Sequence, residues 1–327
     1  MIKLALLAMI KPLVGGQAVV DGVAMRLYEN FSVAIRKQNN KIEIYERKWI
    51  SFSKNNVCLK WPFVRGIVAL LEGIYNGTSV LQFSTDQALG ISNKGQDSDN
   101  QFDWTLIVTI ISCLFLGTMF FKFIPHMAVY LLGQWLEQKQ NIALPVTSIW
   151  FHLLDGGIKI ILFILYIFVI STIKDVKNIF KYHGAEHKSV HVFESDLPLT
   201  VQYAQMQSRI HPRCGTSLIL LTIMISIFLF SLLLPNIPII SNDVLIQNLF
   251  LMMLKIPLMF PIAGLAYEIQ KISMKNQNKL LFQILVLPGT IMQKLTTKEP
   301  TSDQLEVALA ALKSVIERAA KSKVHRT

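Results

Sequence analysis

Four long apolar runs, separated by polar segments, dominate the hydropathy pattern of this 327-residue chain. A helix needs roughly 20 consecutive apolar residues to cross the hydrocarbon layer of a membrane, and each run approaches that length. The pattern therefore predicts four membrane-spanning helices, at approximately residues 104–124, 149–173, 215–234 and 244–267. Pro257 and Pro261 predict a bend in the last of them.

The N-terminal region has a different periodicity. Residues 32–36 and 41–45 alternate polar and apolar side chains on either side of Gln38-Asn39-Asn40, a pattern typical of a β-hairpin with a short turn. We therefore predict a small β-rich unit within residues 1–60. The apolar run that begins the chain is too short for a convincing signal peptide, so we expect it to be retained along the membrane surface.

Between this unit and the first span, helical periodicity appears once more. Residues 63–81 place Arg65 and Glu72 on one polar side, which predicts an amphipathic helix on the membrane. The polar run at residues 92–100 then reads as a linker into the first span.

The C-terminal region predicts three further pieces. Residues 279–286 and 290–295 are short apolar segments separated by Pro288-Gly289, and we expect both to be interfacial. Residues 302–321 have the spacing of a last helix, which we expect to be a solvated tail helix without an active role.

Composition supports a membrane location. The chain is 52% hydrophobic and 16% charged, with a mean hydropathy of +0.43, more apolar than an ordinary soluble domain. Its three cysteines, Cys58, Cys113 and Cys214, show no regular spacing that would indicate a disulfide framework. A reduced, cytosol-facing location fits this cysteine usage.

The basic residues are distributed unevenly between the segments that flank the spans. Residues 1–103 hold 12 Lys and Arg, residues 174–213 hold 6 and residues 268–327 hold 10, whereas residues 125–148 and 235–243 hold 1 and 0. Because cytoplasmic segments near spans are enriched in Lys and Arg, we expect the N-terminus, the central loop and the C-terminus in the cytoplasm. Topology and attraction to anionic lipid thus account for the net charge of +11 without nucleic acid.

The predicted fold class is a mainly α membrane protein with about four transmembrane helices, a small N-terminal cytosolic β-rich unit and interfacial amphipathic helices. We expect the chain to divide into the β-rich unit, an amphipathic helix with a linker, a four-span membrane domain that includes a cytoplasmic loop at 174–214, and a cytosolic C-terminal segment with a terminal helix. The boundaries of these four parts are 1–60, 61–103, 104–267 and 268–327.

Candidate chemistry is concentrated in the central loop. His183-Gly-Ala-Glu186-His187 is an H-x-x-E-H motif, which places two imidazoles one turn apart on the same face of a helix. In metalloproteases with this motif the two histidines hold a metal ion, for which we expect Zn²⁺, and the glutamate is the general base. Glu186 is therefore the candidate catalytic residue, with a simple ion pair between a Glu and a His as the competing interpretation.

A third ligand is available from two other segments. His211 and Cys214 come immediately before the third span, and Glu268 lies at the cytoplasmic end of the fourth, so all three are expected at the depth of the motif. Cys214 can equally be a small buried hydrophobic residue. Lys188 and Arg213 are expected to bind an anionic group of the substrate. His191 and Glu194 continue the helix face of the motif and are expected at most to support the ligands.

Polar residues also occur within the spans. His152, Asp155 and Lys159 share one helix face in the first half of the second span, which leaves open whether that span starts near residue 149 or 158. Asp155 and Lys159 either neutralise one another or belong to a functional path. Lys255, in the fourth span, either extends to the interface or pairs with Asp155 across the bundle.

Five motifs in order resemble the YqhQ family of bacterial membrane proteins. They are Gly15-Gly-Gln-Ala-Val-Val-Asp-Gly-Val-Ala-Met-Arg26, Tyr182-His-Gly-Ala-Glu-His-Lys188, His211-Pro-Arg-Cys-Gly-Thr-Ser217, Pro261-Ile-Ala-Gly-Leu-Ala-Tyr-Glu268 and Gln293-Lys-Leu-Thr-Thr-Lys-Glu-Pro300. The family pattern has Glu at the position of Asp21 and Met at the position of Ala24. The resemblance implies a multi-pass protein of the bacterial cytoplasmic membrane and a predicted metal-dependent enzyme without an established function, and it supplies no substrate.

Three functions are compatible with these residues. The first is a zinc-dependent hydrolase whose site lies at the cytoplasmic interface and whose substrate is lipid-linked or is itself a membrane protein. The second is a non-enzymatic assembly or regulatory protein with a structural metal or an ion-pair site, which four protein ligands would favour because catalytic zinc keeps one position open. The third is a transporter that uses Asp155, Lys159 and Lys255.

Overall fold

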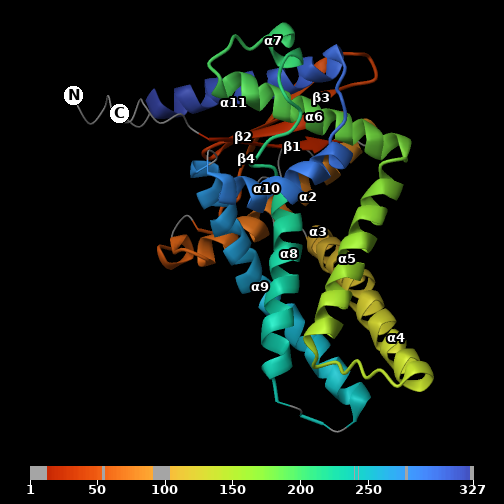
Figure 1. The fold of residues 1–327 in the computed structure, drawn as a ribbon. Helices are drawn as coiled ribbons and strands as arrows, with labels where there is room; N and C mark the ends of the chain where they lie inside the picture. The colour runs from red at the N-terminus through yellow and green to blue at the C-terminus, as the bar shows by residue number, and fades with distance from the viewer. Residues whose placement is uncertain are drawn as a thin grey trace.

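The computed structural model describes residues 13–53, 56–90, 104–238, 240–241, 243–276 and 279–324. Figure 1 shows a sheet and several helices gathered at one end of a bundle of long helices. The residues before 13 and the predicted linker at 92–100 lie outside the described part of the chain.

The N-terminal unit is a four-stranded antiparallel sheet. Its strands are β1 (Val14–Val19), β2 (Gly22–Leu27), β3 (Asn30–Arg36) and β4 (Ile42–Lys48), in the order β1-β2-β3-β4. The predicted hairpin is confirmed as β3 and β4. Two-residue turns join β1 to β2 and β2 to β3, and Asp21 and Tyr28 accommodate them with φ angles of 50° and 58°.

Both faces of the sheet are covered, which explains why strand β2 does not alternate in hydrophobicity. On one face Met25 and Ala34 pack against Ala185 of α6 (Lys174–Glu194) and Leu312 of α11 (Ser302–Val324). On the other face Val33 packs with side chains of α2 (Val64–Ala88), among them Val80 and Phe83. The expectation that residues 302–321 form a solvated tail is therefore wrong: α11 is a core element, because its apolar stripe is covered by the sheet.

Helix α2 forms as predicted, but its polar side is turned inward. Glu72 is buried, and its carboxylate accepts hydrogen bonds from Trp49 Nε1 at 3.1 Å and from the backbone N–H of Phe52 at 2.8 Å. The short η1 (Cys58–Lys60) precedes α2. Glu72 therefore anchors the segment after β4 and does not face solvent.

The four predicted spans are confirmed as helices long and apolar enough to cross a membrane. The first comprises α3 (Trp104–Thr118), the π-helical η2 (Met119–Phe123) and α4 (Ile124–Gln140), and the others are α5 (Ile149–Ile170), α8 (Gly215–Leu233, followed by η3, Leu234–Asn236) and α9 (Val244–Lys275). The first and last helices extend beyond the predicted ends, and α9 continues through Pro257 and Pro261. Helix α5 begins at Ile149, so its polar residues belong to the bundle.

The two predicted interfacial pieces near residue 288 are one helix, α10 (Leu280–Thr296). Pro288-Gly289 predicts a break, but at this point α10 packs closely against α8: a Cβ on Gly289 would lie 2.6 Å from Cβ of Ser217. The glycine therefore permits a helix contact. Five large apolar side chains of α10 remain exposed, namely Leu280, Leu281, Ile284, Leu287 and Ile291.

The sheet, α6 and α11 come from three separate parts of the sequence and share one core. The short α7 (Val201–Gln205) lies beside α6 and α11 (Figure 1). The N-terminal, central and C-terminal segments therefore lie at the same end of the bundle, the arrangement that an even number of crossings requires.

Candidate metal centre

Helix α6 presents both histidines of the H-x-x-E-H motif from one face. The ring centroids of His183 and His187 lie 4.4 Å apart. Residue 184 is a glycine because a Cβ there would lie 2.2 Å from the carbonyl oxygen of Lys298. This close approach brings the His183 ring to the C-terminal end of α10.

Backbone carbonyls contact the same ring nitrogen of both histidines. The carbonyl oxygen of Thr296 lies 2.8 Å from Nδ1 of His183, and that of Arg209 lies 2.6 Å from Nδ1 of His187. A carbonyl oxygen only accepts hydrogen bonds, so in the neutral form of either ring Nδ1 carries the proton and Nε2 carries the lone pair. This is the orientation of a metal-binding histidine. Burial also lowers the pKa of His187, which keeps that ring neutral.

Cys214 lies beside the two imidazoles. Its Sγ is 3.2 Å from Nε2 of His183 and 3.1 Å from Oγ1 of Thr216, and the side chain is buried. Cys214 is also the residue at the N-terminal cap of α8. Of the three candidates for a third ligand, Cys214 is therefore the one in direct contact with His183.

Gln293 of α10 positions the loop that carries His211 and Cys214. Its side chain is fully buried; it accepts a hydrogen bond from the backbone N–H of His211 at 2.7 Å and donates to the carbonyl of the same residue at 2.8 Å. Gln270 of α9 donates to the carbonyl of Cys214 at 3.2 Å. Both amides join the loop to the membrane helices.

The three residues His183, His187 and Cys214, here called the ligand cluster, fit a zinc ion. Their ligand atoms lie within 4.8 Å of one another. Two ligands of a tetrahedral zinc ion lie roughly 3.5 Å apart, since Zn–N and Zn–S bonds measure about 2.0 and 2.3 Å. Imidazole nitrogen and thiolate sulfur are ordinary zinc ligands, and a set of three leaves a coordination position open.

Glu186 is buried next to this cluster, between α6 and strand β1. A Cβ on Gly16 would lie only 2.6 Å from Cγ of Glu186, so the glycine of β1 makes room for this side chain. Burial raises the pKa of the Glu186 carboxyl, and the nearby His183 and His211 oppose that increase. Within the described part of the chain, its carboxylate makes no hydrogen bond. A buried carboxylate of increased basicity suits a general base.

His211 belongs to a second group, the His211 network, with His191, Glu194 and Arg213. Nε2 of His211 is 3.3 Å from Oε2 of Glu194, and its Nδ1 accepts the backbone N–H of Arg213 at 3.2 Å. Arg213 forms an ion pair with Glu194. The lone pair of His211 is thus occupied by a backbone donor. Hydrogen bonds and one ion pair hold this network together, and the ligand atoms of His191, Glu194 and His211 are also close enough to hold an ion.

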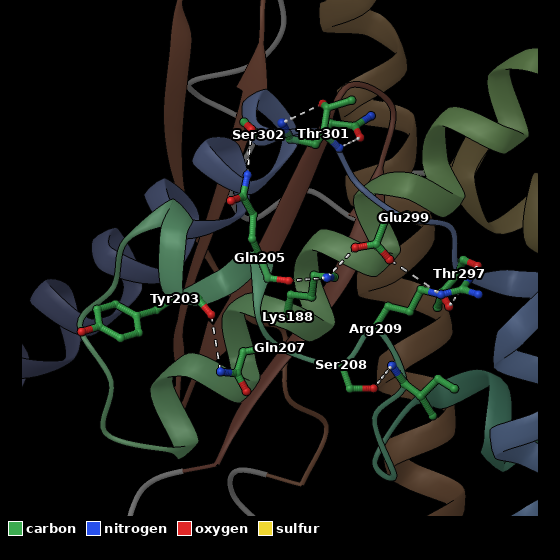
Figure 2. A network of polar contacts seen from close by, with 12 residues as sticks. Lys188, Tyr203, Gln205, Gln207, Ser208, Arg209, Thr297, Glu299, Thr301 and Ser302 are labelled. Atoms are coloured by element: carbon green, nitrogen blue, oxygen red, sulfur yellow. Dashed lines mark hydrogen bonds and ion pairs between the residues drawn. The ribbon is translucent and has the colours of Figure 1, made fainter.

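The other predicted ligand and the predicted anion-binding residues have partners of their own. Glu268 accepts two hydrogen bonds from Arg65 of α2, at 2.6 and 2.5 Å, outside both clusters. Lys188 is buried, lies 2.6 Å from Oε1 of Glu299 and donates to the carbonyl of Gln205 at 2.9 Å, as Figure 2 shows. Lys188 and Arg213 therefore connect segments of the protein to each other.

The intramembrane residues lie in a different part of the molecule. Lys255 is 2% exposed, and its Nζ lies 2.9 Å from Oδ2 of Asp155. Lys159 lies 2.6 Å from the same oxygen. The sequence allowed Lys255 either to extend to the interface or to pair with Asp155. The structure shows the pair with Asp155.

Sequence reasoning missed the residues that orient the ligands. Thr296 and Arg209 contribute backbone carbonyls, and Gln293 contributes its side-chain amide. Gly16 has no side chain and so leaves room for Glu186. The sequence did contain an indication of three of these residues, because Gly16, Gln293 and Thr296 lie within the motifs that resemble the YqhQ family. Four of those five motifs meet at this site.

Comparisons with known proteins identify the family of this chain. A family described as "Protein of unknown function (DUF1385)" matches residues 61–318. The chain is 31% identical over 317 residues to the "Uncharacterized protein YqhQ" of Bacillus subtilis (strain 168), an alignment that covers 94% of this chain and 93% of that protein. No solved structure matches. This chain therefore belongs to the DUF1385 family, in which it is similar to YqhQ.

Proposed function

We propose that this protein is a zinc-dependent hydrolase of the cytoplasmic membrane, with its metal held by His183, His187 and Cys214. One observation supports the proposal: two backbone carbonyls engage Nδ1 of both imidazoles, which leaves Nε2 of each ring to face the cluster, where Sγ of Cys214 contacts Nε2 of His183. Histidines that merely fill space or bind lipid phosphate do not need this arrangement.

The chemistry follows from the groups around this cluster. When bound, zinc polarises water or the oxygen of a scissile bond. Glu186 accepts the proton of the attacking water at its carboxylate, which burial makes more basic. The carbonyls of Thr296 and Arg209 stabilise the positive charge that the two imidazoles gain as ligands. Three protein ligands favour this catalytic function over a structural one, for which four are usual.

A membrane amphiphile is the substrate class that the surroundings support. The apolar side chains of α10 are exposed, as expected for a helix at a membrane interface. A cavity of about 300 Å³ lies between α9 and α10. It is lined by Pro212, which is next to His211, and by Met274, Phe282, Val286 and Leu287, among others. A lipid-linked substrate would enter this cavity from the bilayer with its polar end toward the ligand cluster.

The metal content of the purified full-length protein tests the proposal. We expect one zinc per chain in the wild type and in Glu186→Gln, because Glu186 is not a ligand, and none or little in His187→Ala and Cys214→Ala. Hydrolysis of short-chain phospholipid or lipid-phosphate substrates should be lost in all three variants. His191→Ala is the matched control, a histidine on the same helix whose loss should leave the zinc in place. A wild type without stoichiometric metal would refute the proposal, and full hydrolysis by Glu186→Gln would refute the role of Glu186.

A further inference from the structure

Ionisable side chains outside the ligand cluster gather inside the membrane-spanning bundle. We call them the buried charge cluster: Lys122, His126, His152, Asp155, Lys159 and Lys255. Asp155 is six residues into α5 and Lys159 ten, so they lie about 9 and 15 Å along that helix. The hydrocarbon layer is about 30 Å thick, which places the cluster well within it. Charged side chains are costly at this depth, so their presence indicates a functional site.

The cluster is held together by one carboxylate oxygen. Oδ2 of Asp155 accepts hydrogen bonds from Lys159 at 2.6 Å and from Lys255 at 2.9 Å. Nζ of Lys255 also lies 3.4 Å from Nδ1 of His126. Lys122 and Lys255 both lie against the ring of Phe230, at 5.5 and 5.9 Å from its centroid. Three ammonium groups thus surround a single acidic residue.

The charges of this cluster do not balance. Lys122 is within electrostatic range of Lys159, Lys255 and Asp155. Among the described residues, Asp155 is the carboxylate with which Lys159 and Lys255 pair, and Lys122 donates to the carbonyl of Lys255 at 3.5 Å. Counted with all three lysines protonated, the positive charges exceed the negative charge by two, in a region where uncompensated charge is strongly unfavourable.

Some polar atoms of the cluster also lack partners. His152 is 2% exposed, yet neither of its ring nitrogens makes a hydrogen bond to the described part of the chain, and the same holds for Oδ1 of Asp155. Buried polar atoms are almost always hydrogen-bonded, so these atoms indicate a missing ligand or solvent. The π-helical turn Met119–Phe123, a feature frequent at functional sites, carries Lys122.

An apolar cavity lies beside this region. It measures about 220 Å³ between α4 and α9 and is lined by Phe123, Met127, Tyr130, Leu249 and Met252, together with His126 and Asn248. Nε2 of His126 lies 3.0 Å from Oδ1 of Asn248. The apolar lining suits a hydrocarbon chain, and His126 joins the cavity to Lys255.

We propose that the buried charge cluster binds one phosphate monoester or inorganic phosphate ion inside the bundle. At pH 7 a phosphate monoester carries a charge of about −1.5 to −2, which matches the excess of two positive charges. Its oxygens accept hydrogen bonds from Lys122 and Lys159, and a protonated oxygen or an accompanying water reaches His152 and Oδ1 of Asp155. The site shares no residue with the ligand cluster and does not depend on the proposed hydrolase activity.

Isothermal titration of the purified full-length protein in detergent tests this proposal with three probes. Dioctanoyl phosphatidic acid represents a lipid source, inorganic phosphate represents a free ion, and dioctanoyl phosphatidylcholine has the same chains without net charge. Binding of phosphatidic acid alone identifies a lipid ligand, and binding of inorganic phosphate, with or without the lipid, identifies a site open to the free ion. No binding of either, or equal binding of the two lipids, would overturn the proposal.

A matched pair of variants on the first span locates the binding. Lys122→Gln removes one cation but leaves the pairs of Asp155 intact, so the protein should fold. We expect it to weaken phosphate binding at least about tenfold, the usual effect of losing a charge-assisted hydrogen bond. Lys139→Gln, exposed at the end of α4, should stay within about twofold of the wild type. Equal affinities of Lys122→Gln and the wild type would place the phosphate elsewhere and overturn the proposal.

Discussion

At the scale of single residues, neighbouring glycines in strand β1 have different functions. A Cβ on Gly15 would meet no atom within 4 Å, whereas a Cβ on Gly16 would lie 2.6 Å from Cγ of Glu186 and 2.7 Å from its Oε1. Gly16 therefore determines how closely the sheet approaches the candidate base. The pair Gly15 and Gly16 offers a controlled test of that contact.

We expect Gly16→Ala to displace Glu186 and to destabilise the protein by about 1–3 kcal/mol, the usual cost of overpacking a buried site. Gly15→Ala is the control, because both substitutions reduce the flexibility of the unfolded chain equally but only Gly16→Ala creates a clash. Thermal unfolding of both variants in detergent measures the difference. Equal midpoints would show that β1 does not lie against Glu186.

At the scale of elements, small residues bring membrane helices together. Gly156 of α5 lies against α8, where an added Cβ would be 2.5 Å from Cγ2 and 3.0 Å from Cβ of Ile227. Gly157, the next residue, has open space around it. Since lipid chains are as apolar as the helices, close packing of this kind stabilises helix pairs in a membrane.

Gly156→Ala should therefore separate α5 from α8 and lower the unfolding midpoint in detergent, by the equivalent of about 1–3 kcal/mol. Gly157→Ala should be neutral or slightly stabilising, because alanine favours a helix over glycine. A lower midpoint for Gly157→Ala than for Gly156→Ala would mean that the face of α5 in contact with α8 is different.

At the scale of the whole molecule, residues from the beginning, middle and end of the chain form one unit on the bundle. Leu312 of α11 is fully buried in the core that the sheet shares with α6. Because α6 carries the candidate metal ligands, the C-terminal helix supports the site from a distance. The hydropathy of α11 by itself does not show that the helix belongs to this core, since an amphipathic helix can lie on a membrane or pack against protein.

Leu312→Ala should lower the free energy of unfolding by about 2–5 kcal/mol, as expected for a leucine removed from a core. Its exposed neighbour provides the control, and Lys313→Ala should change the stability by less than about 0.5 kcal/mol. Urea unfolding followed by circular dichroism measures both. If Leu312→Ala were as stable as the control, α11 would not be part of the core.

The sequence by itself determined the number of spans, the β3–β4 hairpin and the pair of histidines one turn apart, because hydropathy and side-chain periodicity are local properties of the chain. It did not indicate β1 and β2 as strands, since β2 is covered on both faces and β1 is rich in glycine. It also left open which of His211, Cys214 and Glu268 lies beside the histidines. Only the tertiary structure decided that: Arg65 engages Glu268, a backbone N–H occupies His211, and Cys214 lies next to His183. Such partners come from distant segments, and their positions depend on how the helices pack.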